Sequence, residues 1–154
     1  ERIFMKEIRK KNRMWEYGDI LKEYDNIFRG IAKKMGLSEC SFWILYILRT
    51  DNVEPVQSEI CACLYESKQT VNSALKKMES EGYLKLTSGK DRRSKRILLT
   101  TAGISLCERT VDRVIERERN ALEDLTEEEQ DLFLALFRKF NGLLKAHMQG
   151  VSEA

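Results

Sequence analysis

The sequence contains few residues that interrupt helices and few that build catalytic or metal sites. Pro55 is the one proline among 154 residues, which permits long uninterrupted helices. His147 is the one histidine, so a nitrogen-rich zinc site is not expected. A glycine-rich phosphate loop and a nucleophile–base–acid arrangement are both missing from the sequence. We therefore expect neither an enzyme nor a protein with a metal or another cofactor.

The cysteines also lack the spacing of a known cysteine site. Cys40, Cys61, Cys63 and Cys107 form neither the framework of a small secreted protein nor the paired C-x-x-C of a zinc ribbon. On a helix, Cys61 and Cys63 would point about 200° apart, so they are not expected to bond to each other. We interpret Cys61 as a small buried apolar residue. Cys63 or Cys40 would be the reactive thiol of a redox sensor, although neither has an adjacent basic cluster to lower its pKa.

Long apolar runs and a strong overall charge are missing as well. No run approaches the roughly 20 apolar residues that cross a bilayer, and no signal peptide is visible. We therefore expect a cytoplasmic protein without a membrane partner. The net charge is only +2, but residues 66–100 contain nine Lys and Arg against four Asp and Glu. Positive charge concentrated in one segment indicates contact with nucleic acid or another polyanion.

This basic segment begins with a two-faced helix. On a helical wheel that starts at Ser67, apolar and short polar residues gather on opposite sides. The side expected to face the core contains Val71, Ala74, Leu75 and Met78. The side expected to face outward contains Gln69, Asn72, Ser73 and Lys76. Ser67 can cap the start of this helix, and Gly82 is placed to end it.

The residues around this helix complete a known arrangement. A shorter helix is predicted over residues 57–64, and two short helices joined by a tight turn are typical of a helix-turn-helix. The second helix of that motif enters the major groove of DNA. After Gly82, alternating apolar residues at 84–87 and 96–99 predict a two-stranded hairpin. Its loop, residues 88–95, holds four cations and one acid, so the hairpin is interpreted as a wing.

Amphipathic helices are predicted on both sides of this module. Apolar spacing predicts helices over residues 5–35 and 38–49, with Gly36 ending the first and Ser38 capping the second. A helix with coiled-coil-like spacing follows from Thr101, and Thr126 begins a capping box for a last helix. Their apolar faces exceed what the small module can cover, which predicts pairing with a second copy. The fold class is therefore mainly α, a winged helix-turn-helix with a two-stranded β wing and an α-helical dimerisation region from both chain ends.

Taken in order, these motifs resemble those of the multiple-antibiotic-resistance regulator (MarR) family of bacterial winged-helix transcription factors. The resemblance covers essentially the whole chain, and its most specific part is Asp91 and Arg93 of the wing, followed by Leu99-Thr100 and Gly103. The matching segments are LSECSFWILYIL, QSEICACL, SKQTVNSALKKMESEGYL, DRRSKRILLTTAG and LTEEEQDLF. Cys-Ala-Cys at 61–63 departs from the family pattern, in which alanine is usually followed by polar residues.

The resemblance implies a homodimer whose two winged modules read a palindromic operator in double-stranded DNA. Residues 1–36 and 101–154 would form the helical dimerisation region, and residues 37–100 the DNA-binding domain. We interpret the chain as a DNA-binding transcriptional regulator, and as a ligand-responsive repressor rather than an activator. Two alternatives remain, a thiol-based redox-sensing regulator and a winged-helix protein-interaction domain that does not bind DNA.

The residues expected to read bases lie on the outward face of the second helix. Gln69, Ser73 and Lys76 are spaced i, i+4 and i+7, where glutamine can pair with adenine and lysine can reach guanine or phosphate. Arg93 is predicted to enter the minor groove. The resemblance implies that Asp91 holds the wing tip in shape. The set expected to contact DNA is completed by Ser58, Ser67, Lys68, Thr70, Asn72, Lys77, Lys90, Arg92, Ser94, Lys95 and Arg96.

The resemblance also implies an effector pocket near the junction of the first, second and fifth helices, for a small aromatic or phenolic molecule. The candidate lining residues are Tyr24, Phe28, Trp43, Tyr46 and Val111. Core packing or a dimer contact is the favoured role for each of them, because aromatic residues at helical spacing are ordinary core residues.

Overall fold

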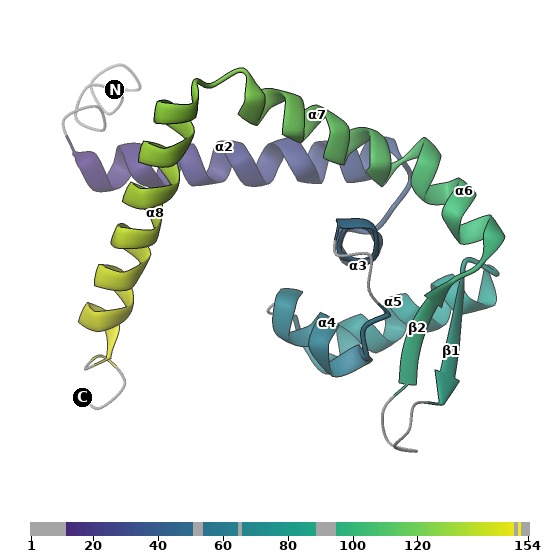
Figure 1. The fold of residues 1–154 in the computed structure, drawn as a ribbon. Helices are drawn as coiled ribbons and strands as arrows, with labels where there is room; N and C mark the ends of the chain where they lie inside the picture. Colours follow the sequence, from purple (N-terminus) through teal and green to yellow (C-terminus); the bar gives the residue numbers. More distant parts are fainter. Residues whose placement is uncertain (1–11, 51–53, 65, 89–94, 150, 152–154) are drawn as a thin grey trace, which may run out of the picture. The chain divides into compact units, whose positions relative to one another are not determined.

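A computed structural model of the chain describes residues 12–50, 54–64, 66–88, 95–149 and 151 (Figure 1). The chain divides into two compact units, Glu1–Asp112 and Arg113–Ala154. In chain order the elements are α2 (Arg13–Lys34), α3 (Glu39–Thr50), α4 (Gln57–Leu64), α5 (Lys68–Ser80), β1 (Leu84–Ser88), β2 (Lys95–Leu99), α6 (Thr101–Arg109), α7 (Val111–Glu123) and α8 (Glu127–Met148). The mainly α fold with a two-stranded wing is confirmed.

Both helices of the helix-turn-helix lie where the sequence predicts them. α4 spans the predicted residues 57–64, and α5 follows it after a short connection. The Ser67 hydroxyl accepts a hydrogen bond from the amide of Thr70 at 3.1 Å, as an N-cap should. Gly82 has a φ of 81°, in the left-handed region that favours glycine after a helix end.

The wing is an antiparallel two-stranded hairpin, and an isolated bridge joins its second strand to the segment before α4. β1 pairs with β2 from Leu84↔Leu99 to Ser88↔Lys95, so the two ends of the predicted loop are paired residues. The amide of Ile97 donates to the carbonyl of Pro55 at 3.0 Å, beside a bridge between Val56 and Arg96. The sequence predicts only a turn around Pro55, because a bridge to a distant strand leaves no local pattern. Residues 89–94 lie outside the described residues.

The core of the winged module forms where α3 meets α5 and the wing. Phe42 and Leu45 of α3 and Leu75 of α5 are fully buried. The predicted apolar face of α5 is confirmed, because its four members are all buried. Burial of that face leaves the polar face of α5 outside, which is the orientation needed for a reading surface.

The helices α2 and α3 begin at capping residues, and a glycine follows the end of α2. Asn12 accepts a hydrogen bond from the amide of Met14 at 3.0 Å, so α2 begins at Arg13. The part of the predicted helix before residue 12 lies outside the described residues. Gly36, with a φ of 70°, follows the end of α2. Ser38 caps α3, because its hydroxyl accepts from the amide of Ser41 at 3.1 Å.

The continuous helix expected from Thr101 onward is wrong. α6 ends at Arg109, and the next residue, Thr110, has φ and ψ of −126° and −96°, which are not helical. The buried Thr110 hydroxyl donates to the carbonyl of Leu106 at 2.5 Å, and this satisfies an acceptor that the end of α6 leaves open. α7 then begins at Val111. Apolar spacing could not show the break, because it continues across Thr110.

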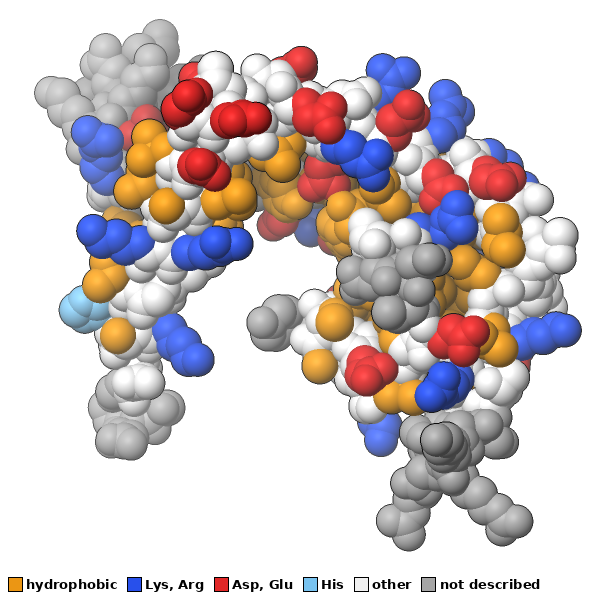
Figure 2. Space-filling model, in the orientation of Figure 1, with side chains coloured by type: hydrophobic (Ala, Val, Ile, Leu, Met, Phe, Trp, Pro, Cys, Tyr) orange, Lys and Arg blue, Asp and Glu red, His pale blue; other side chains and the backbone are white. Residues whose placement is uncertain are grey.

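The unit that contains α8 presents apolar side chains on its surface. The capping box of Thr126 and Glu129 is confirmed, with bonds of 3.2 and 2.9 Å in the two directions. All 22 residues of α8 are described, and none of them is buried. Its large exposed apolar side chains, several of them visible in Figure 2, are Leu132, Phe133, Leu134, Leu136, Phe137, Leu143, Leu144 and Met148. Over the described ranges, no helix has the length and apolar character to span a membrane.

Gly103 stands at the closest approach between α6 and the wing. The Thr100 hydroxyl donates to the Gly82 carbonyl at 2.6 Å and accepts from the Gly103 amide at 3.0 Å. A Cβ atom at Gly103 would lie 2.0 Å from the carbonyl oxygen of Tyr83. These contacts give a physical reason for the Leu99-Thr100 and Gly103 part of the sequence pattern, because only glycine leaves room for the Tyr83 backbone.

We expect Gly103→Ala to lower the free energy of unfolding by about 1–3 kcal/mol or more, because the Tyr83 backbone must move away from the new methyl group. Urea denaturation followed by circular dichroism measures the change. Gly30→Ala in α2 is the matched control, because nothing lies within 4 Å of its Cβ position. The control should be neutral or stabilising by up to about 1 kcal/mol. Equal effects of the two substitutions would contradict this account of Gly103.

Candidate nucleic-acid interface

The outward face of α5 carries the polar residues that the helical wheel separated from the core. Gln69, Ser73 and Lys76 are exposed, and Asn72 is half-buried. Val71 and Leu75, on the other side of the same helix, are fully buried. The structure therefore places the three predicted base-reading residues on one exposed surface.

A groove beside this surface joins three elements that are distant in sequence. It has a volume of about 240 Å³ and lies between the first turn of α4, the outward face of α5 and the wing. Five of the predicted DNA-contact residues line it, namely Ser58, Lys68, Asn72, Lys76 and Lys95. Val56, Gln57, Glu79 and Leu86 complete the lining of what we call the α4–α5–wing groove.

The charges of the α4–α5–wing groove favour an anion. Lys68, Lys76 and Lys95 line it together with one carboxylate, that of Glu79. The first turn of α4 also lines it, and the N-terminal end of a helix carries a partial positive charge from its amides. The groove can therefore hold a phosphate-like group through lysine ammonium groups and helix amides.

Glu79 is the charged residue of this groove that is not among the predicted contacts. Its Oε1 atom accepts a hydrogen bond from the amide of Leu86 at 3.1 Å, which ties the end of α5 to β1. The sequence holds a weak signal for it, because Glu79 follows Lys76 by three residues and so lies on nearly the same helical face. The partner of Glu79 is a backbone amide, and a sequence pattern does not show which amide a side chain will reach.

Some predicted contact residues point elsewhere or are held by other groups. Successive residues of a strand face opposite sides, so Lys95 and Arg96 do not share a surface. Arg96 Nη1 lies 3.6 Å from Glu54 Oε2, in an exposed ion pair. Lys77 Nζ lies 3.9 Å from Glu81 Oε1, and pairs of this exposed kind hold weakly.

Ser67 and Thr70 are also engaged within the protein, because their hydroxyl oxygens lie 2.8 Å apart at the start of α5. Five wing residues of the predicted set lie outside the described residues, namely Lys90, Asp91, Arg92, Arg93 and Ser94. Their assignments remain predictions from the sequence.

Four of the five candidate effector-pocket residues form one aromatic cluster across α2 and α3. The ring of Phe28 lies 4.8 Å from that of Tyr24 and 5.1 Å from that of Trp43, and Trp43 lies 5.2 Å from Tyr46. Phe42, which was not among the candidates, joins the cluster at 5.1 Å from Trp43. Phe42 is fully buried and Phe28 nearly so, as core residues are, while Tyr24 is half-exposed.

The fifth candidate, Val111, is fully buried at the first residue of α7. A role in binding an effector stays a prediction for all five residues. Among the residues that the structure describes, no group of three His, Cys, Asp or Glu side chains could hold a metal ion.

Comparison with known proteins places this geometry in a family. A model described as "MarR family" matches residues 42–94, which cover most of α3, α4, α5 and β1. The uncharacterised HTH-type transcriptional regulator YwoH of Bacillus subtilis (strain 168) is 30% identical over 129 residues. That alignment covers 79% of this chain and 93% of YwoH.

Solved structures share the fold at lower identity. NMB1585, a MarR family regulator from Neisseria meningitidis, has a TM-score of 0.74 and 22% identity, over 92% of this chain and 98% of its own. MepR from S. aureus, in a crystal structure of its complex with DNA, has a TM-score of 0.69 and 21% identity, over 88% of this chain and 98% of its own. From the family match and the extent of the likeness to YwoH, the chain belongs to the MarR family of helix-turn-helix transcriptional regulators.

Proposed function

We propose that the α4–α5–wing groove and the outward face of α5 are the surface through which this transcriptional regulator binds its operator DNA. The observation that carries the proposal is the groove itself, because it brings five independently predicted contact residues from three elements onto one cationic surface. MepR, whose fold this chain shares, was crystallised in complex with DNA.

The two parts of this surface would have different tasks. Gln69, Ser73 and Lys76 would meet base edges in the major groove, where glutamine can bond adenine in two places. Lys68 and Lys95, with the first turn of α4, would hold phosphates and so set the register of α5 on the duplex. Arg93 of the wing remains our proposal for the minor groove.

A second copy of the chain is the partner that best explains the exposed apolar surface. α2 exposes Trp15, Ile20 and Ile27 at about half of their surface, and α8 exposes a longer row of apolar side chains. Surfaces of this kind mark contact with another protein. In a two-fold dimer, two α5 helices would read inverted half-sites about one helical turn apart.

We further propose that the dimer is a repressor released by a small aromatic or phenolic effector, and that it acts in the cytoplasm, where a bacterial chromosome lies. The aromatic cluster of α2 and α3 supports the effector class, because the rings of Tyr24, Trp43 and Tyr46 are only partly buried. A flat apolar molecule could stack on those rings.

The cysteines support the thiol-based alternative poorly. Burial raises the pKa of Cys40, with Glu66 and Cys61 adding to the effect, and raises that of Cys107 to about 11. Both thiols therefore stay protonated near neutral pH and react slowly. Cys61 is half-buried rather than buried as expected, and Cys63 is exposed. A redox response would have to rely on Cys63.

We expect Lys68→Ala and Lys95→Ala to weaken binding to every duplex, because each removes a phosphate contact. Each should also reduce the slope of log affinity against log salt by about 0.9. Fluorescence anisotropy of the full chain with a duplex selected from a random library measures both quantities. Lys85→Ala is the matched control, since Lys85 is exposed on β1 and faces the side opposite Leu86.

Two outcomes would contradict the proposed surface. If Lys85→Ala changes the salt slope as much as Lys68→Ala does, the contacts do not lie in the groove. If the unchanged protein binds no duplex even at low salt, the winged module serves another purpose, as in the protein-interaction alternative.

Substitutions at Glu79 separate its charge from its hydrogen bond. We expect Glu79→Gln to bind DNA roughly threefold more tightly, because the amide oxygen can still accept from Leu86 while a negative charge leaves the groove. Glu79→Ala should bind more weakly than Glu79→Gln, because β1 loses its tie to α5. Glu81→Gln removes the acid directly after α5, which does not line the groove, and it should have less effect. If Glu79→Ala and Glu79→Gln bind alike, the hydrogen bond to Leu86 has no part in recognition.

Thiol labelling at pH 8 tests the chemical states of the cysteines. Cys63 should react with a disulfide reagent at once, because its thiol is exposed. Cys40 and Cys107 should react only after unfolding, because their raised pKa values keep them protonated and burial blocks access. Mass spectrometry of peptides identifies the labelled sites, with Cys63→Ser as the control. Rapid labelling of Cys107 in the native protein would show that the thiol is not shielded as described.

A further inference from the structure

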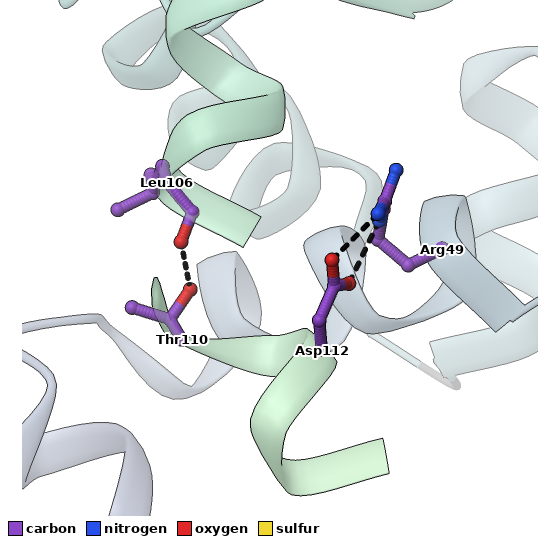
Figure 3. Close-up of polar contacts among 4 residues, drawn as sticks. All are labelled: Arg49, Leu106, Thr110 and Asp112. Atoms are coloured by element: carbon purple, nitrogen blue, oxygen red, sulfur yellow. Dashed lines mark hydrogen bonds and ion pairs between the residues drawn. The ribbon is translucent and has the colours of Figure 1, made fainter. Parts of the chain in front are cut away.

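A double hydrogen bond joins α3 to the start of α7 (Figure 3). Arg49, in the last turn of α3, donates from Nε to Asp112 Oδ1 at 2.7 Å and from Nη2 to Oδ2 at 2.5 Å. Asp112 lies in the first turn of α7. The two residues are 63 positions apart in sequence, so this pair is a tertiary contact and not a local one.

This contact differs from the other ion pairs of the described residues. The Arg49 and Asp112 side chains are only 30% and 26% exposed, whereas Arg29 and Glu39 are 61% and 51% exposed and 3.3 Å apart. A planar guanidinium on a carboxylate in the two-bond arrangement fixes orientation as well as distance. The pair therefore fixes Asp112, at the start of α7, in both distance and orientation against the last turn of α3.

The pair lies directly after the break between α6 and α7. Thr110 breaks the helix between α6 and α7, and its hydroxyl is bonded to Leu106 (Figure 3). Val111 is fully buried directly before Asp112. Asp112 is also the last residue of the first compact unit. The chain therefore passes from the winged unit to the next unit at the residue that Arg49 holds.

We propose that Arg49 and Asp112 are positioning residues for operator recognition, which set the direction in which α7 leaves the winged module. The inference rests on the proposed function, because α7 and α8 would belong to the dimerisation region. In such a dimer, the direction of α7 determines how far apart the two α5 helices lie. Neither residue would contact DNA, and both would control which spacing of half-sites the dimer accepts.

Duplex geometry makes this spacing a sensitive measurement. Each added base pair moves one half-site by about 3.4 Å and turns it by about 35° around the duplex axis. A dimer with a rigid junction should bind one spacing well and its neighbours poorly. A dimer whose α7 can change direction at Thr110 should lose affinity for the best spacing and discriminate less against the others.

The experiment uses the full chain and duplexes derived from a site selected from a random library. One or two base pairs are inserted or removed between its half-sites, and anisotropy gives the affinity for each duplex. We expect the unchanged protein to prefer the selected spacing by about tenfold or more over a two-base-pair change. Arg49→Ala and Asp112→Asn should each reduce that preference to about threefold or less.

The double variant should show no further loss beyond either single one, because both substitutions remove the same contact. Arg49→Lys, which keeps the charge but not the two-bond geometry, should give an intermediate preference and serves as the test if Arg49→Ala does not fold. Arg29→Ala, at the exposed ion pair with Glu39, should keep the preference of the unchanged protein.

The outcomes separate this inference from a purely stabilising role and from the proposed function. If the variants bind all spacings more weakly by one common factor, the pair only stabilises the fold and the inference is overturned. If the unchanged protein selects a site but shows no spacing preference, DNA binding stands and the inference fails. If it selects no duplex, both the proposed function and the inference fail.

Discussion

The burial of one face of α5 is the constraint on which the rest of the winged module depends. Val71 and Leu75 are fully buried where α5 packs on α3, whose Phe42 and Leu45 are fully buried too, so α5 is held against rotation about its own axis. Gln69, Ser73 and Lys76 are therefore held outward by the burial of the opposite face of the helix. A reading surface of this kind needs a rigid core beneath it, because base contacts tolerate little displacement.

Hydrogen bonds between neighbouring elements hold the walls of the α4–α5–wing groove in place. Glu79 ties α5 to β1, Pro55 and Val56 pair with β2, and Thr100 joins the wing to the end of α5. Glu79 also places a negative charge among three lysines, which lowers attraction to any polyanion. Non-specific DNA binding is almost wholly electrostatic, so the Glu79 carboxylate weakens it. Weak non-specific binding suits a regulator that must leave such DNA to find its own site.

Periodicity and capping residues predicted most of the helices, the strands and both faces of α5, because those features depend on neighbours within a few positions. The break at Thr110 was missed, since it depends on a side-chain bond inside an uninterrupted apolar pattern. The role of Glu79 and the bridge beside Pro55 depend on backbone partners that only the folded chain brings near. In the groove itself, five contact residues were predicted, but the opposite directions of Lys95 and Arg96 required the strand register.

Base contacts alone do not determine the separation between the two half-sites, and the proposed role of the Arg49–Asp112 pair supplies that control. A two-fold regulator must control the identity of each half-site and the separation between them, and α5 can supply only the first. The separation has to be set where the winged module meets the helices that would join the two copies. A partly buried, two-bond ion pair suits this position, because its planar geometry fixes direction as well as distance.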